Sequence, residues 1–236
     1  MGKNLIGGWD MWKLYDDLYI GIPSGIRITG CVIGKYWTTV RIDGNVGLAR
    51  TIEQPADPAC FAAGFVGRFL RDVAGHLYWK SLAESSVGVA ALNAWYNTES
   101  RVKGLEGLEK PGEYKGKTAF VGNYVCKDAF PLPMTPDFDQ KSYKTLANYD
   151  NVVIASKALI TRSLPKLLDV IGERGNVILE GYSLPATALF FSFGMPVREL
   201  QGYYPRVIDT VEACAIKEIK DPATRMQKFS IRSFSC

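Results

Sequence analysis

The sequence predicts an α/β protein built from a small α+β part followed by a parallel-sheet part. Residues 27–51 are rich in β-branched and aromatic side chains and contain an Asp-Gly-Asn turn at 43–45, which predicts an antiparallel meander. Residues 103–117 are dense in glycine and charge, which is typical of a linker. After residue 118, short apolar runs alternate with helical stretches, and this alternation favours a parallel sheet.

The first part, residues 1–102, is expected to surround its meander with helices. Apolar side chains recur at helical spacing in residues 10–20 and 59–73. A third helix is expected over 82–97, where Ser81 and Glu84 form a capping-box pattern. Three strands are expected in this part, near residues 27–33, 36–42 and 46–51.

The third predicted helix carries polar side chains along one line of an otherwise apolar surface. Ser86, Asn93 and Asn97 are seven and four residues apart, so at about 100° per residue they share nearly one direction. Two interpretations remain open: these residues form the exposed face of the helix, or they line a cleft between the two parts.

The second part, residues 118–236, is expected to form the parallel sheet. Its apolar runs predict strands buried on both faces, and its helices are expected between and after them. The predicted strands are 118–122, 151–155, 176–180 and 197–200, and the predicted helices are 162–171, 185–193 and 205–214.

The candidate site lies in the loops that follow these strands, because ligands of open parallel sheets bind outside the carboxyl ends near the switch point. The loops 121–124, 155–158 and 180–185 contain glycines that permit close approach of a ligand. Ordinary strand-to-helix turns would explain the same glycines. The candidate ligand-binding residues are Gly122, Asn123, Ser156, Gly181 and Ser183, together with Asn93 of the third helix.

Motifs of common enzyme classes are missing from the sequence. It contains no G-x-G-x-x-G, no P-loop and no G-x-S-x-G elbow, which disfavours binding of NAD or nucleoside triphosphates and serine-hydrolase chemistry. The single histidine, His76, precedes an aromatic stretch, so a packed histidine is favoured over a catalytic base.

Composition and charge narrow the function classes further. The chain has 236 residues with a formal charge of +4 and no dense basic stripe, which disfavours nucleic-acid binding. Its five cysteines are scattered without a C-x-x-C motif, which disfavours structural zinc. No apolar run is long enough for a membrane helix, and the start does not resemble a signal peptide. We therefore expect a cytoplasmic protein without a membrane partner.

Blocks of sequence along most of the chain resemble a prokaryotic family labelled "putative heavy-metal chelation". The blocks occur in the order of that family and run from about residue 11 to about residue 220. They are WKLYDDL at 12–18, GIP at 21–23, VIG at 32–34, VGLA at 46–49, ESSVGVAALNA at 84–94, DNVVI at 150–154, SLPKLL at 163–168 and GYSLP at 181–185, and the similarity continues over 191–202.

The resemblance implies an enolase-N-terminal-like α+β domain packed on a Rossmann-like domain, with a site in the cleft between them. It implies that the protein binds a metal or a metal chelate. The metal is expected to be a divalent ion held by hard oxygen donors such as Glu84, Asn93 and Ser183. One alternative is a transferase using a ligand like S-adenosylmethionine or a pterin. A second is a non-catalytic structural or regulatory protein.

The chain departs from the family pattern in two places. Its first Rossmann-like loop reads Gly122-Asn123-Tyr124 where the family commonly has Gly-His-Phe, so a candidate metal-binding imidazole is missing. The segment 122–150 is shorter than its counterpart, which places a nucleotide-type pocket in doubt. The exposed edges of the meander suggest a homodimer.

Overall fold

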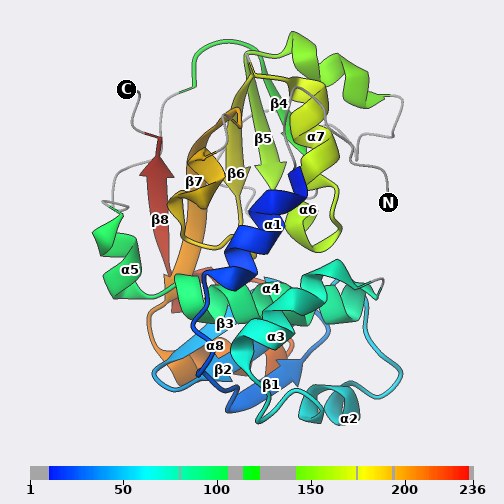
Figure 1. The fold of residues 1–236 in the computed structure, drawn as a ribbon, viewed down its shortest axis with the longest axis vertical. Helices are drawn as coiled ribbons and strands as arrows, with labels where there is room; N and C mark the ends of the chain where they lie inside the picture. The colour runs from blue at the N-terminus through cyan, green and yellow to red at the C-terminus, as the bar shows by residue number, and fades with distance from the viewer. Residues whose placement is uncertain are drawn as a thin grey trace.

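The protein contains two β-sheets that follow one another along its long axis (Figure 1). The structure is a computed structural model. It describes residues 11–79, 81–105, 114–122, 142–173, 175–192 and 195–233. The predicted linker falls partly outside this set, so the proposed domain boundaries at 102 and 118 stay predictions. The fold class is confirmed, because an antiparallel three-stranded sheet with helices precedes a mostly parallel five-stranded sheet.

The three-stranded sheet is the predicted meander. It consists of β1 (Gly30–Ile33), β2 (Trp37–Ile42) and β3 (Asn45–Arg50), paired antiparallel in the order β1-β2-β3. Gly44, in the turn between β2 and β3, has a φ of 77°, which glycine adopts without strain.

Helices cover both faces of this sheet. On one face lies α4 (Leu82–Tyr96), which approaches β3 closely because a Cβ on Gly47 would clash with the helix backbone at Ala90. On the other face lies α8 (Ile208–Ile216), which comes from the second half of the chain. Two ion pairs hold α8 there, since Arg41 Nη2 lies 2.6 Å from carboxylate oxygens of both Asp209 and Glu212.

The remaining helices of the first part are short, apart from α1 (Met11–Ile20). The single helix expected over 59–73 is wrong. It is two helices, α2 (Pro58–Ala63) and α3 (Leu70–Ala74), because Gly67 has a φ of 83° and Phe69 is extended. The other elements here are the 3-10 helix η1 (Gly75–Tyr78) and α5 (Glu99–Gly104).

The five-stranded sheet pairs in the order β4-β5-β6-β7-β8. The first four strands, which correspond to the four predicted ones, are parallel, and the fifth, which was not predicted, is antiparallel to its neighbour. The order never reverses among the described strands, and they therefore contain no switch point. The strands are β4 (Thr118–Val121), β5 (Asn151–Ala155), β6 (Asn176–Glu180), β7 (Val197–Pro205) and β8 (Met226–Arg232).

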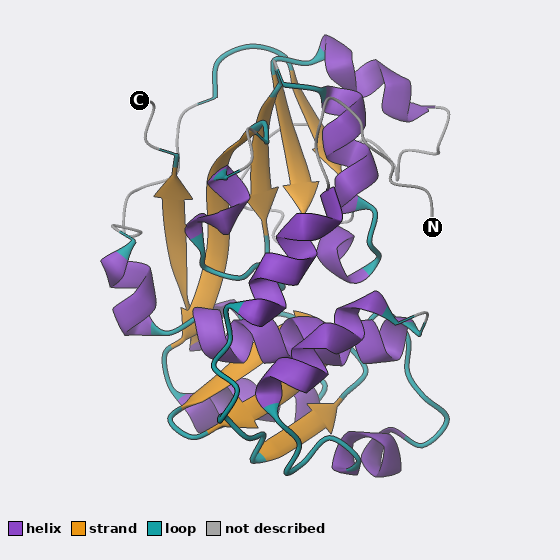
Figure 2. Cartoon of the chain, viewed as in Figure 1, coloured by secondary structure: helices purple, strands orange, loops and turns teal. Residues whose placement is uncertain are grey.

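Helices α6 (Lys157–Ile160) and α7 (Leu164–Ile171) pack on one face of the five-stranded sheet (Figure 2). The helix expected over 185–193 is the 3-10 helix η3 (Ala188–Phe191). Two further 3-10 helices precede strands, η2 (Ser142–Asn148) before β5 and η4 (Ala223–Arg225) before β8.

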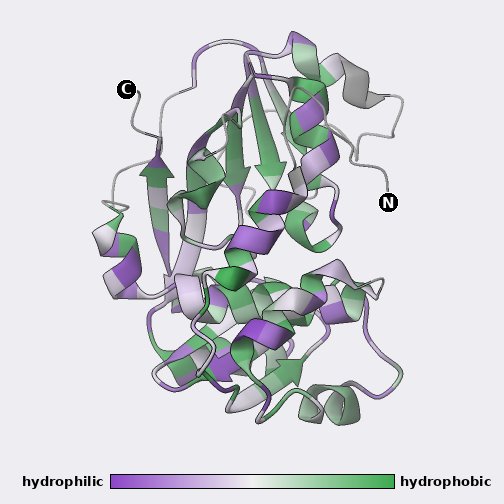
Figure 3. Ribbon diagram, in the orientation of Figure 1, coloured by the Kyte–Doolittle hydropathy of each residue, from purple (hydrophilic) through white to green (hydrophobic). Residues whose placement is uncertain are grey.

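The two parts share one apolar core. A single buried cluster contains Leu18 and Leu92 from the first part and Ile154 and Leu200 from the second. Strands β5 and β6 are almost wholly hydrophobic, whereas β8 alternates between polar and apolar residues (Figure 3). Because the parts share a core, a site at their junction is held by packing from both sides.

Candidate functional site

The carboxyl ends of the parallel strands point toward α4, which places the predicted loops at the junction of the two parts (Figure 1). Two of these loops are hydrogen-bonded to each other, because the Ser183 N–H donates to Ser156 Oγ at 3.1 Å. Ser183 Oγ in turn accepts from the Arg50 N–H at 2.8 Å. Gly181 has a φ of 131°, and a Cβ there would clash with Ser156 Oγ. The glycine is therefore required by this tight joint.

The polar line of α4 faces the same joint. Asn93 Nδ2 donates to the carbonyls of Leu48 and Tyr182, at 2.7 and 3.2 Å. Asn97 Nδ2 donates to two carbonyls of the second part, and its Oδ1 accepts from the Ala186 N–H at 2.8 Å. Both asparagines are buried, as is Ser86, so the interpretation of an exposed face is wrong. These amides hold the two parts together.

Gly122 directly follows β4 and has a φ of 105°. A Cβ there would lie 2.8 Å from Ala155 Cβ and 3.1 Å from Lys157 Cε, so a larger residue would be crowded by the neighbouring strand end. Asn123 lies outside the described residues. The binding roles of Gly122, Asn123, Ser156, Gly181, Ser183 and Asn93 stay predictions.

Glu84 lies in the first turn of α4, where its N–H donates to the Ser81 cap at 3.4 Å. Its carboxylate Oε1 is 3.7 Å from His76 Nδ1. His76 is buried and stacks on Trp79 with ring centroids 4.6 Å apart, as expected for a packed histidine. Burial lowers the pKa of His76 and raises the pKa of Glu84. A metal-binding role for Glu84 stays a prediction.

Sequence reasoning missed a second group of polar side chains, which surrounds the carboxyl end of β6 and the neighbouring parts of β7 and β8. It lies on the face of the five-stranded sheet opposite α6 and α7, because Glu180 alternates with Leu179 and Glu199 with Leu200, which belong to the apolar core. We call this group the carboxyl-edge cluster. It comprises Tyr114, Glu180, Glu199, Gln201, Lys228 and Ser230.

Glu199 lies at the centre of the carboxyl-edge cluster, and both of its carboxylate oxygens have partners. Its Oε1 accepts hydrogen bonds from Ser230 Oγ at 2.6 Å and Gln201 Nε2 at 2.9 Å. Its Oε2 accepts from the Tyr114 hydroxyl at 2.7 Å and lies 3.4 Å from Arg232 Nε. With both oxygens occupied, Glu199 positions its neighbours and has little capacity left for a ligand.

Gln201 and Glu180 each present an oxygen that lacks a donor. Gln201 Nε2 donates to Glu199 and also to the Tyr114 hydroxyl, which fixes the amide and directs Oε1 away from both. Neither Gln201 Oε1 nor Glu180 Oε2 has a hydrogen-bond partner in the described part of the chain. Glu180 and Gln201 are register partners on adjacent strands, and Gln201 is fully buried while Glu180 is 4% exposed.

The electrostatic surroundings of Glu180 are mixed. Burial raises the pKa of its carboxyl group, and Lys228, with Nζ 3.6 Å from Oε1, opposes that rise. A buried acceptor without a donor costs about 1–3 kcal/mol. A cation, the N–H groups of a ligand, or a proton on Glu180 would each remove that cost.

One sequence signal could have found the cluster. A strand in the middle of a sheet with both faces covered is expected to be continuously apolar. Strand β7 instead carries Glu199 and Gln201 two residues apart, on one face. Their pairing with Glu180 and Ser230 depends on a register that the sequence does not contain.

The cysteines of the described ranges do not form part of a metal-binding group, and Cys126 and Cys236 lie outside those ranges. Cys31, Cys60 and Cys214 lie on β1, α2 and α8, and the described residues contain no group of three or more His, Cys, Asp or Glu side chains that could hold a metal. Separately, none of the described helices combines the length and the apolar character that crossing a bilayer requires.

Two family models match the chain, and solved structures share its fold. Both models are described as "Putative heavy-metal chelation"; DUF4213 matches residues 15–96 and DUF364 matches residues 115–215. A DUF364 protein of unknown function from Desulfitobacterium hafniense DCB-2 is 23% identical with a TM-score of 0.82, over 94% of this chain and 98% of that one. One from Pyrococcus horikoshii is 16% identical with a TM-score of 0.69, over 94% and 99%.

No curated protein gives a significant match. The structural likenesses establish the fold, and the two family models lie in order over most of the sequence. The chain therefore belongs to the DUF4213/DUF364 family, whose two domains are both described as "Putative heavy-metal chelation".

Proposed function

We propose that the protein binds a divalent metal ion as an anionic organic chelate, at the carboxyl-edge cluster. The observation that carries this proposal is the pair of buried, donorless oxygens, Glu180 Oε2 and Gln201 Oε1, on adjacent strands. A cation would satisfy both at once. The family description supports the same class of ligand.

The chemistry of the cluster favours a particular kind of metal ligand. Carboxylate and carboxamide oxygens suit hard or borderline ions such as Mn²⁺ better than soft ions that prefer thiolates. Two protein oxygens leave most coordination positions open, so the ion keeps waters or the oxygens of a chelator. The ammonium group of Lys228, 3.6 Å from Glu180, repels a free cation and attracts an anionic chelate.

The proposed site lies beside the junction of the two parts. Glu180 begins the loop 180–185, in which the Tyr182 carbonyl accepts from Asn93 of α4 and Ser183 Oγ accepts from the Arg50 N–H of β3. A ligand held at Glu180 would therefore lie close to the interdomain position that the family resemblance implies.

A second candidate ligand is favoured by the same two oxygens. A flat heterocycle of the pterin type, with adjacent N–H donors, would satisfy Glu180 Oε2 and Gln201 Oε1 as well as a metal would. This ligand would favour the transferase alternative. A chain that binds neither class would favour the structural or regulatory alternative.

Mass spectrometry separates the ligand classes. The native mass of freshly purified protein is compared with its denatured mass. A free metal adds a few tens of daltons, while a chelate or a heterocycle adds a few hundred. Metal analysis of the released material then tells the chelate from the heterocycle.

Calorimetric titration tests the position of the site. We expect EDTA-treated protein to bind Mn²⁺-citrate more tightly than Mn²⁺ alone or citrate alone. Glu180→Gln keeps the shape but removes the charge, and should weaken Mn²⁺-citrate binding at least about tenfold. Glu173→Gln, on an exposed carboxylate, is the matched control and should bind like wild type. Equal binding by Glu180→Gln and wild type would disprove this site.

A further inference from the structure

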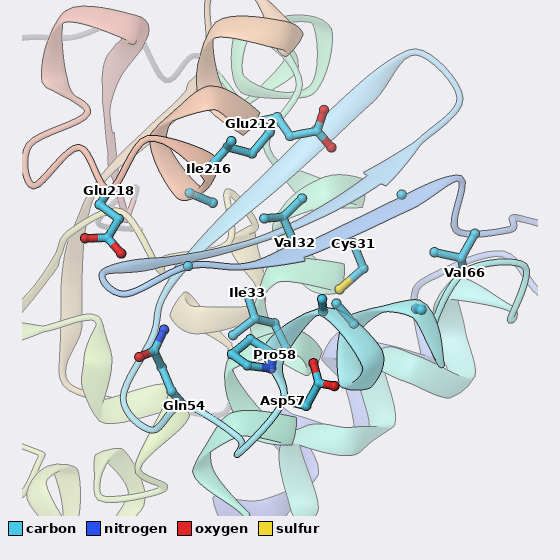
Figure 4. A pocket seen from close by; sticks show the side chains of 16 residues that line it. Cys31, Val32, Ile33, Gln54, Asp57, Pro58, Val66, Glu212, Ile216 and Glu218 are labelled. Carbon is cyan, nitrogen blue, oxygen red and sulfur yellow. The ribbon is translucent and has the colours of Figure 1, made fainter.

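A groove distinct from the proposed metal site runs along the outer edge of β1 (Figure 4). Its volume is about 720 Å³, and it is lined by β1 and the following Gly34, by α2 on one side and by the end of α8 on the other. We call it the β1 groove. Strand β1 is the edge of its sheet, because the described strands pair in the order β1-β2-β3.

The free edge of β1 offers unpaired backbone groups to the groove. The Gly34 N–H donates to the Trp37 carbonyl at 2.9 Å, and the register pairs Val32 with Thr39. Since antiparallel pairs alternate, Gly34 and Val32 point their backbone groups toward β2, while Cys31 and Ile33 point theirs away. No other backbone segment of the described chain bonds to β1 on that side.

The two walls of the β1 groove leave room for the side chains of an added strand. On the α2 side the lining includes the small residues Ala59 and Ala62, and Cys31 and Ile33 point toward that side. On the α8 side Val32 points toward Ile216, which is 63% exposed. Exposed apolar side chains beside a free strand edge are typical of sites that bind an extended peptide.

The charge of the β1 groove has one sign. Its charged lining residues, Asp57, Glu212 and Glu218, are all acidic, and its lining contains no lysine or arginine. Arg41 pairs with Glu212 from outside the lining. Burial and the nearby Glu212 raise the pKa of the Cys31 thiol to about 12, so the thiol stays neutral and is a poor metal ligand near pH 7.

We propose that the β1 groove binds an extended, basic peptide segment of a partner protein, which adds a fourth strand to the three-stranded sheet. The backbone groups of Cys31 and Ile33 would bind the main chain of the peptide, and the acidic lining would bind its lysine or arginine side chains. A second copy of the chain fits less well, because pairing β1 with β1 would oppose two acidic grooves.

Peptide titration tests this inference. The probes are fluorescein-labelled eight-residue peptides of alternating lysine and valine, or of alternating glutamate and valine. We expect the lysine peptide to bind and the glutamate peptide to bind at least tenfold more weakly. Hydrogen exchange of the Cys31 and Ile33 amides should slow when the lysine peptide binds. Failure of the lysine peptide to bind, or equal binding of both peptides, would overturn the proposal.

Two matched variants separate the groove from general charge effects. Ile216→Lys places a positive charge in the β1 groove and should weaken lysine-peptide binding at least tenfold. Val207→Lys, on an equally exposed residue before α8 and outside the groove, should leave it unchanged. Equal effects of the two variants would overturn the proposal. A wild-type dimer that Ile216→Lys dissociates would also overturn it, because the groove would then be a contact between copies.

Discussion

The joint between α4 and the loops after β5 and β6 differs from the carboxyl-edge cluster in how its buried polar groups are used. In the joint, Asn97 uses its amide nitrogen and oxygen in three hydrogen bonds to the second part. In the cluster, Glu180 and Gln201 are equally buried, yet each has an oxygen without a donor. The hydrogen bonds of Asn97 fix the arrangement of the two parts. Asn93 Oδ1 in the same joint also lacks a donor, but in the cluster two such acceptors lie on adjacent strands, where one ligand can complete both.

The largest expected effect on stability comes from removing the Asn97 side chain from the joint between the two parts. Asn97→Ala leaves the Leu184 and Tyr203 carbonyls and the Ala186 N–H without their partner, and each unpaired group costs about 1–3 kcal/mol. We expect the free energy of unfolding in urea to fall by about 4 kcal/mol. Asn148→Ala, on an exposed residue, should change it by less than about 0.5 kcal/mol. A loss below about 1 kcal/mol for Asn97→Ala would show that the joint is not structural.

A smaller loss is expected at Gly181. Alanine there combines a positive φ of 131° with a clash against Ser156 Oγ, so Gly181→Ala should lower the free energy of unfolding by about 2–3 kcal/mol. Gly25 has open space around its Cβ position and an ordinary φ, so Gly25→Ala is the control and should cost nothing measurable. Similar stability of the two variants, measured in urea, would mean that the loop relaxes.

In the carboxyl-edge cluster, removing the charge of Glu180 is expected to raise the free energy of unfolding at neutral pH, whereas the substitutions in the joint lower it. Because the pKa of Glu180 is raised, the folded protein holds this proton more tightly than the unfolded chain does. Its contribution to stability therefore falls as pH rises above the ordinary glutamate value of 4.5. We expect EDTA-treated Glu180→Gln to be more stable than wild type at pH 7.5, by about 1 kcal/mol, and closer to it at pH 4.5.

Urea titrations of both proteins at the two pH values measure this difference. Mn²⁺-citrate should stabilise wild type more than it stabilises Glu180→Gln. A Glu180→Gln variant that is less stable than wild type at pH 7.5 would show that the Glu180 carboxylate is structurally required, like the joint.

The smallest effect is expected at His76, outside both regions. Burial, with a further contribution from Arg68, lowers the pKa of its imidazole below the ordinary 6.5. The unfolded chain then binds the proton first, so this contribution to stability is complete above pH 6.5 and is lost as pH falls through the lowered value. His76→Gln should show a weaker decline in the free energy of unfolding between pH 7 and 5. If His76→Gln lost as much stability between pH 7 and 5 as wild type does, other titratable groups would be responsible for that loss.

Local patterns predicted much of the fold because they report local physics. The strands at 151–155 and 176–180 coincide with β5 and β6, since apolar runs in parallel sheets are buried on both faces. The capping pattern at Ser81 predicted the start of α4 for the same kind of reason, because the cap bonds within its own turn.

The sequence by itself determined the fold class, the three strands of the meander, the four parallel strands, the family, and the polar line along α4. Only the tertiary structure decided that this line faces a buried joint, that α8 packs on the first sheet, and that Glu180 meets Gln201 across β6 and β7. The physical reason is that helix and strand preferences act over a few residues. Burial and strand register depend instead on segments that are distant in the chain and that meet only when the whole core packs.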